Sequence, residues 1–324
     1  MQASSILINL NNDHVRKSLP WSKLIAAIEE AVCLCVIQAP QRCSYRLASA
    51  DGAAGNLLIM PAWQDDEVIG MKTVTVWPDN DARGLPSHGA NYLVMAARTG
   101  ELQAVLDGEE LTSRRTAAIS VIAAKRLMRA DARRLLIVGA GPVAENIAEA
   151  FTAIYDFATV EIHARRPERA ADVVRRLAGK GVEAAVCTDL QAGAGRADVI
   201  SLATSAREAV LKGEWITAGT HIDMVGSFTP DMRETDDALI SRATSIWVDT
   251  VAALDESGDL TQPLASGILD RSAVCGDLAA LLASQSTRDA AAITVFKAVG
   301  FALPDLAAAR CALESVEEPL SLIA

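Results

Sequence analysis

Two glycines directly follow an apolar run in the segment Leu135-Leu136-Ile137-Val138-Gly139-Ala140-Gly141-Pro142-Val143-Ala144. Glycine allows a tight turn and a close approach of the backbone to a ligand, and a helix that begins at Pro142 presents free N–H groups to a diphosphate. Ala144 stands where the GxGxxG pattern has its third glycine, and it still permits close packing of helix on strand. The segment predicts a dinucleotide site formed by Gly139, Ala140, Gly141, Pro142 and Val143, with a plain strand-to-helix turn as the alternative interpretation.

The end of the next apolar run, Thr159–Ala164, bears on which dinucleotide binds. An acid there usually accepts the ribose 2′-hydroxyl of NAD, whereas an arginine accommodates the 2′-phosphate of NADP. Arg165 and Arg166 follow the run, and Glu161 falls inside it, short of its end. We therefore expect NADPH, with NADH possible, and assign Arg165, Arg166 and Thr204 to cofactor binding. Solvated arginines ahead of the next helix are the alternative.

Two adjacent arginines, Arg114 and Arg115, are expected in the first turn of a helix that begins near Thr112. Acids are normally preferred there, because the helix dipole is positive at this end. A guanidinium beside free helix N–H groups makes a good receptor for a carboxylate. We expect at least one of the two adjacent side chains to point to solvent.

Two more basic residues can be interpreted in the same way. Arg42 lies in Pro40-Gln41-Arg42, and Lys72 lies inside the apolar run Ile69–Val74. A lysine in so apolar a run occupies either an exposed face or a pocket. Together with Arg115 these residues would form an anion-binding clamp, although their spacing alone does not bring them together.

The elements that must position these residues fall into two groups. The first third combines an amphipathic helix, from Trp21 to Cys35, with strand-like runs and is of α+β type. From about Thr116 strands and helices alternate, which predicts a doubly wound parallel sheet of the Rossmann type and hence an α/β protein. The tail from Thr294 to Leu313 is expected to be helical and to return to the first domain. The strand-like runs are Leu57–Trp63, Val68–Trp77, Tyr92–Ala97 and Leu102–Leu106, and the polar, turn-rich loop Pro78–Gly89 separates the second from the third.

Length and composition narrow the class of protein. A chain of 324 residues with 51% hydrophobic residues can bury a large core and suggests two domains. The net charge of -11 argues against a nucleic-acid or anionic-membrane partner. The six cysteines show no CxxC pair and no zinc-ligand spacing, so no metal is expected. Without a secretory pattern before Lys17 or a membrane-length apolar run, we expect a cytoplasmic protein.

Short motifs follow one another along the chain in an order that resembles the ornithine cyclodeaminase/mu-crystallin family. The resemblance covers nearly the whole chain and implies a homodimer. It implies that residues 1–115 and 300–324 form the substrate-binding and dimerisation domain, and residues 116–299 the dinucleotide-binding domain. It also implies that Arg42, Lys72 and Arg115 hold the substrate carboxylate, with Gly300 beside them. The motifs are Pro40-Gln41-Arg42, Gly70-Met71-Lys72, Leu106-Asp107-Gly108, Arg115-Thr116-Ala117-Ala118, the Gly139 turn, Val225–Glu234 and Phe296-Lys297-Ala298-Val299-Gly300.

One position separates the reactions within this family. Ornithine and lysine cyclodeaminases carry an aspartate where this chain has Phe228, and a phenyl ring cannot accept a proton. The flanking residues resemble those of the ketimine reductases, which implies NAD(P)H-dependent reduction of cyclic imino acids, the five-membered Δ1-pyrroline-2-carboxylate and the six-membered Δ1-piperideine-2-carboxylate. In that reaction Lys72, His88 and Ser227 are the expected catalytic residues, with His88 managing the imine proton. An ornithine cyclodeaminase, an alanine-dehydrogenase-like oxidoreductase and a non-catalytic small-molecule binding protein of mu-crystallin type remain alternatives.

Overall fold

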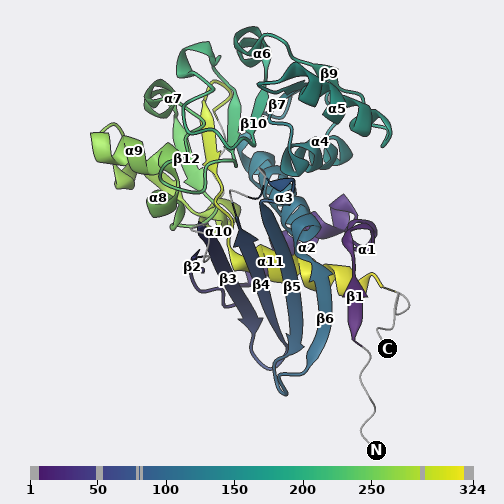
Figure 1. Cartoon of the computed structure of the whole chain (residues 1–324). Coiled ribbons are helices and arrows are strands. Elements are labelled where there is room, and N and C mark those ends of the chain that lie inside the picture. Colours follow the sequence, from purple (N-terminus) through teal and green to yellow (C-terminus); the bar gives the residue numbers. More distant parts are fainter. Residues whose placement is uncertain (1–6, 49–53, 78–79, 81–82, 285–288, 317–324) are drawn as a thin grey trace, which may run out of the picture. The chain divides into compact units, whose positions relative to one another are not determined.

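The chain folds into two compact units in the computed structural model, which describes residues 7–48, 54–77, 80, 83–284 and 289–316 (Figure 1). The first unit comprises Met1–Arg115 and Phe301–Ala324, and the second comprises Thr116–Gly300. Each unit has its own β-sheet, six-stranded in the first and eight-stranded in the second. Residues 78, 79, 81 and 82 of the expected polar loop lie outside the described residues.

The sheet of the first unit has the strand order β1-β6-β5-β4-β3-β2. β1 runs parallel to β6, and the other neighbouring strands are antiparallel. Buried residues alternate with partly exposed ones at the start of β4, so Gly70 and Lys72 lie on one face and Ile69 and Met71 on the other. The strands are β1 (Ile8–Leu10), β2 (Cys43–Ala48), β3 (Ala54–Gln64), β4 (Val68–Val76), β5 (His88–Ala96) and β6 (Leu102–Asp107).

Helices cover the face of this sheet that carries Lys72. α11 (Ala302–Glu314) contacts β3, β4 and α2 (Trp21–Leu34), and Figure 1 shows it lying along the sheet. The side of α2 predicted to be apolar is buried at Leu24, Ile28 and Val32. The short α1 (Asn12–Ser18) contacts α11 and β6, and α3 (Gly108–Leu127) begins directly after β6.

The second unit is a doubly wound parallel sheet with the order β13-β12-β14-β11-β10-β7-β8-β9, which confirms the predicted fold class. All of its paired strands are parallel, and the central strands are buried throughout, as expected for a sheet covered on both faces. Its strands are β7 (Arg134–Val138), β8 (Thr159–His163), β9 (Ala185–Val186), β10 (Val199–Leu202), β11 (His221–Met224), β12 (Ser245–Val248), β13 (Val274–Gly276) and β14 (Thr294–Lys297). Its helices, besides the later part of α3, are α4 (Pro142–Ile154), α5 (Pro167–Ala178), α6 (Leu190–Arg196), α7 (Asp237–Arg242), α8 (Ala253–Glu256), α9 (Gly258–Ser266) and α10 (Leu278–Ala283).

The tail differs from the prediction at its start. Thr294–Lys297 is not helical but forms β14, a fully buried strand between β11 and β12. A threonine, a valine and a phenylalanine in succession suit a buried strand better than a helix. Gly300 then adopts φ +80°, which ends the extended segment before α11 begins at Ala302. Within the part of the chain that the structure describes, no helix is long and apolar enough to cross a bilayer.

Candidate functional site

The turn after β7 has the geometry of a dinucleotide cradle. Gly139 adopts φ +145°, and a Cβ there would lie 2.4 Å from the Ala203 carbonyl oxygen, so glycine is required. Gly141 is the N-cap of α4, with Pro142 at its first helical position. A Cβ on Gly141 would meet nothing within 4 Å, so open space lies in front of the helix N-terminus. These residues fit a diphosphate held by the free N–H groups of α4.

A buried carboxylate joins the segments that follow β10 and β11. Glu234 Oε1 accepts from the backbone nitrogen of Thr204 (2.8 Å) and from its hydroxyl (2.7 Å). Glu234 Oε2 accepts from the backbone nitrogen of Gly226 (2.6 Å). Burial raises the pKa of Glu234, and the Lys297 ammonium opposes this. Thr204 is thus fixed at the carboxyl edge of the sheet, where doubly wound folds bind their ligands.

The residues expected to choose between NAD and NADP take different positions. The Glu161 carboxylate is bound by both Nε (3.0 Å) and Nη2 of Arg196. Arg165 and Arg166 carry exposed side chains between β8 and α5. The acid is therefore engaged within the fold, and the two arginines stand at the strand end.

Two of the predicted clamp residues meet in the first unit, around an acid that the sequence interpretation missed. Arg115 Nε donates to Asp305 Oδ1 at 2.8 Å, and Lys72 Nζ lies 2.7 Å from Asp305 Oδ2. The side chains of Lys72, Arg115 and Asp305 are 2%, 6% and 0% exposed. Two buried cations thus share one buried carboxylate, which leaves a positive charge for an anion to neutralise.

The field around Lys72 is consistent with an anion site. Burial, together with the charges of Arg115 and Arg42, lowers the pKa of Lys72 from 10.5 to about 8, although Asp305 raises it. Arg42, partly exposed ahead of β2, is therefore close enough to repel Lys72. Tyr92 pairs with Lys72 across β4 and β5, and burial keeps the pKa of its phenol well above the usual range.

The helix carrying Arg114 and Arg115 begins earlier than predicted, and neither arginine points to solvent. Asp107 accepts from the Glu110 backbone nitrogen (2.8 Å) and starts α3 at Gly108, so the first turn is acidic and follows the usual rule. Arg114 lies 3.9 Å from the Trp21 ring centroid and donates to the Leu19 carbonyl oxygen.

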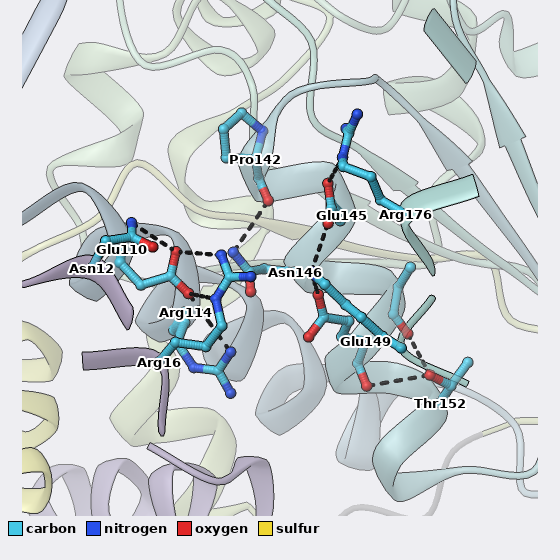
Figure 2. A network of polar contacts seen from close by, with 12 residues as sticks. Asn12, Arg16, Glu110, Arg114, Pro142, Glu145, Asn146, Glu149, Thr152 and Arg176 are labelled. Carbon is cyan, nitrogen blue, oxygen red and sulfur yellow. Dashed lines mark hydrogen bonds and ion pairs between the residues drawn. The ribbon is translucent and has the colours of Figure 1, made fainter. Parts of the chain in front are cut away.

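The carboxylate of Glu110 links this helix to α1. Figure 2 shows Asn12, Arg16 and Arg114 around it, with Arg16 Nε donating at 2.9 Å. Arg114 and Glu110 are both buried and serve this internal network. Arg115 is therefore the member of the arginine pair that joins the clamp.

The remaining predicted site residues are not in the clamp. His88 is exposed at the start of β5, on the same face as Tyr92 but four strand positions away, about 13 Å. Ser227 is fully buried; its hydroxyl donates to the Met232 carbonyl oxygen (2.8 Å) and contacts the Ser257 hydroxyl (2.9 Å). Gly300 donates its backbone N–H to Asp249 at 2.6 Å.

Asp305 and Glu234 are the functional candidates that sequence reasoning missed. Asp305 is a single acid in the alanine-rich, buried first half of α11. That is the same anomaly that singled out Lys72 in its apolar strand, so the signal was present in the sequence. Glu234 lay inside a quoted motif but gave no local sign that it binds two backbone segments.

A turn with the geometry of a diphosphate cradle on a parallel sheet, and a buried pair of cations in the other unit, are features of a dinucleotide-dependent oxidoreductase. The profile of the ornithine cyclodeaminase/mu-crystallin family matches residues 8–319, and the chain belongs to this family. It is 42% identical over 256 residues to Delta(1)-pyrroline-2-carboxylate reductase of Paracoccus denitrificans, covering 78% of this chain and 81% of that protein.

Two solved structures have the same fold over almost the whole chain. Delta(1)-pyrroline-2-carboxylate reductase of Thermococcus litoralis, in complex with NADH and L-proline, gives a TM-score of 0.87 at 29% identity and covers 95% of this chain and 97% of that one. An archaeal alanine dehydrogenase dimer with bound NAD gives 0.85 at 28% identity and covers 95% of both chains. The family predicted from the ordered motifs is confirmed.

Proposed function

We propose that the protein reduces cyclic ketimine carboxylates with a reduced nicotinamide cofactor, converting Δ1-pyrroline-2-carboxylate to L-proline and Δ1-piperideine-2-carboxylate to L-pipecolate. The observation that carries this proposal is the buried pair of cations, Lys72 and Arg115, around one acid in the first unit. The relative from Paracoccus denitrificans bears the name of this activity, and the Thermococcus litoralis enzyme binds NADH and L-proline. Phe228 supports reduction over cyclodeamination, because it cannot accept a proton.

The clamp residues bind the substrate and orient it. Arg115 and Lys72 donate N–H groups to the substrate carboxylate, and Arg42 adds positive potential beside them. When bound, the reduced nicotinamide supplies a hydride to the carbon of the protonated C=N bond, which becomes the amine. The turn at Gly139–Val143 holds the diphosphate.

His88 and Ser227 receive different parts in this proposal. His88 supplies or holds the imine proton. Ser227 keeps its internal hydrogen bonds and fixes the segment that carries Phe228, which is 49% exposed. A His88→Gln variant tests the role of His88, since it should lose turnover without losing binding of the substrate carboxylate.

The cofactor in use is NADPH. This part of the proposal is supported by the exposed Arg165 and Arg166 and by the engagement of Glu161 with Arg196. Replacing both arginines by alanine should raise the KM for NADPH at least about tenfold and leave that for NADH within about twofold. Arg169→Ala, at an exposed arginine inside α5, serves as the matched control. Equal losses for both cofactors would contradict NADPH specificity.

The protein acts as a homodimer in the cytoplasm. The face of the first sheet opposite Lys72 carries a continuous set of partly exposed apolar side chains, which a second copy would cover. These residues are Leu57, Ile59, Ile69, Met71, Leu93, Met95 and Val105. All six cysteines are free thiols, as suits a reducing compartment.

A cofactor-oxidation assay with the two imines side by side tests the function. Loss of NADPH absorbance with formation of L-proline or L-pipecolate supports the proposal. No oxidation of NADPH or NADH with either imine, from mildly acidic to alkaline pH, would refute it. Ammonia release from L-ornithine without net cofactor turnover would establish cyclodeamination. NAD-linked turnover of L-alanine would establish an alanine dehydrogenase, and binding of the imine without turnover would establish a ligand-binding protein.

A further inference from the structure

Asp305 brings together three segments that are far apart in the sequence. It lies in the first turns of α11, 190 positions after Arg115, and is completely buried. One of its carboxylate oxygens contacts Arg115 Nε and the other contacts Lys72 Nζ. A carboxylate with one oxygen on each of two cations fixes the separation and the orientation of both.

The contact on Nε determines which edge of Arg115 remains for a ligand. A guanidinium binds a carboxylate in a bidentate manner through pairs of its five N–H groups. Among the described residues, Asp305 is the hydrogen-bond partner of Nε, and the structure shows none for the two terminal nitrogens. A substrate carboxylate would therefore meet the terminal nitrogens of Arg115 and the remaining N–H groups of Lys72.

Asp305 is also the counter-charge that keeps two cations together. The ionisable groups facing Lys72 are Asp305 from α11, Arg115 from α3, Arg42 ahead of β2 and Tyr92 from β5. Arg115 and Arg42 repel a charged Lys72, and Asp305 attracts it. Without the acid, two buried like charges would stand side by side, and one would lose its proton or turn away.

We propose that Asp305 is a positioning residue of the clamp, which holds Lys72 and the Nε edge of Arg115 so that one substrate carboxylate binds the remaining N–H groups of both cations. The inference rests on the proposed function, in which the clamp binds a cyclic imino acid. Asp305 touches neither the substrate nor the cofactor in this role. Its loss should therefore change KM and leave kcat nearly unchanged.

The test uses Asp305→Asn, Asp305→Glu and a surface control in the full-length protein. Asn keeps an acceptor for Arg115 but places an amide group against Lys72, whereas Glu keeps the charge on a longer side chain. Asp66→Asn is the matched control, because Asp66 is 79% exposed and pairs with Arg98 at the surface. KM and kcat for the imine are measured from pH 6 to pH 10.

For Asp305→Asn we expect KM to rise at every pH, by at least about tenfold at pH 8 where Lys72 also loses its charge, and kcat to change little. Asp305→Glu should raise KM at every pH and keep the wild-type pH at which KM begins to increase. Asp66→Asn should match wild type. If Asp305→Asn does not fold, Asp305→Glu alone tests the inference. A shift in the pH dependence of its KM relative to wild type would contradict the inference.

A KM for Asp305→Asn equal to that of wild type at every pH would overturn the inference and leave the proposed function standing. If wild type turns over no imine, the proposed function fails. The role of Asp305 is then tested by urea denaturation of wild type and Asp305→Asn without ligand. The rise in stability that we expect for wild type above pH 8 should then begin at lower pH in Asp305→Asn. An unchanged onset would overturn the inference.

Discussion

Replacing Lys72 by methionine should make the protein more stable and inactive. The side chain is 2% exposed, and methionine fills nearly the same volume without a charge. Removing one of two cations that share a carboxylate leaves a balanced pair, Arg115 with Asp305, rather than an isolated charge. The substitution therefore removes a cation that is buried for function.

The magnitude follows from the pKa of Lys72, which burial, Arg115 and Arg42 lower from 10.5 to about 8. The difference between those values corresponds to roughly 3 kcal/mol. Between pH 8 and 10.5 the unfolded chain keeps a proton that the folded protein has released, so the stability of wild type rises with pH through this range. Below pH 8 the whole cost of the buried charge is present. Lys72→Met should therefore be about 1–3 kcal/mol more stable than wild type near pH 7 and nearly equal to it near pH 10.

Urea denaturation followed by tryptophan fluorescence at the two pH values measures this difference, with Lys17→Met, at an exposed lysine, as the control. L-Proline should stabilise wild type and not Lys72→Met, because a ligand stabilises only the state that binds it. The KM for the imine should rise at least about tenfold. A variant less stable than wild type at both pH values would refute the reasoning, since the Lys72 charge would then stabilise the fold.

Five further substitutions test the local geometry. Gly139→Ala should destabilise the protein by about 2–4 kcal/mol, because φ is +145° and the added Cβ meets the Ala203 carbonyl oxygen. The Cβ of Gly141→Ala meets nothing within 4 Å, so this variant should keep the urea midpoint of wild type. It should bind NADPH at least about tenfold more weakly in a fluorescence titration. Arg114→Ala should cost about 2–4 kcal/mol in urea denaturation by removing the contacts to Trp21 and Leu19, with an unchanged imine KM; a raised KM would place Arg114 in the clamp. Tyr92→Phe should keep or raise the melting temperature, because the phenol oxygen has no hydrogen-bond partner among the described residues. It should also lessen the loss of stability caused by Gly70→Ala, whose Cβ would lie 2.1 Å from that oxygen. If the two substitutions had additive effects in the double variant, this packing would be contradicted.

The cradle could be predicted from the sequence because its determinants are consecutive. Gly139, Gly141 and Pro142 each serve a backbone requirement of a single turn, and the apolar run before them forms β7 directly. The start of α3 was misplaced for a related local reason. Asp107 and the two glutamates after it were not recognised as a helix start, so Arg114 and Arg115 were assigned to the first turn.

The clamp could be predicted only in part, because its members meet through tertiary structure. Lys72 and Arg115 were noticeable one at a time as charges that contradict their surroundings. Asp305 contradicts its surroundings in the same way, but it could not be singled out while the whole tail from Thr294 was interpreted as one helix. Once Thr294–Lys297 is recognised as the buried strand β14 and Gly300 as the break after it, α11 becomes a separate buried helix of the first unit. An unpaired acid in such a helix requires a cation, and the two unexplained cations of the same unit supply it.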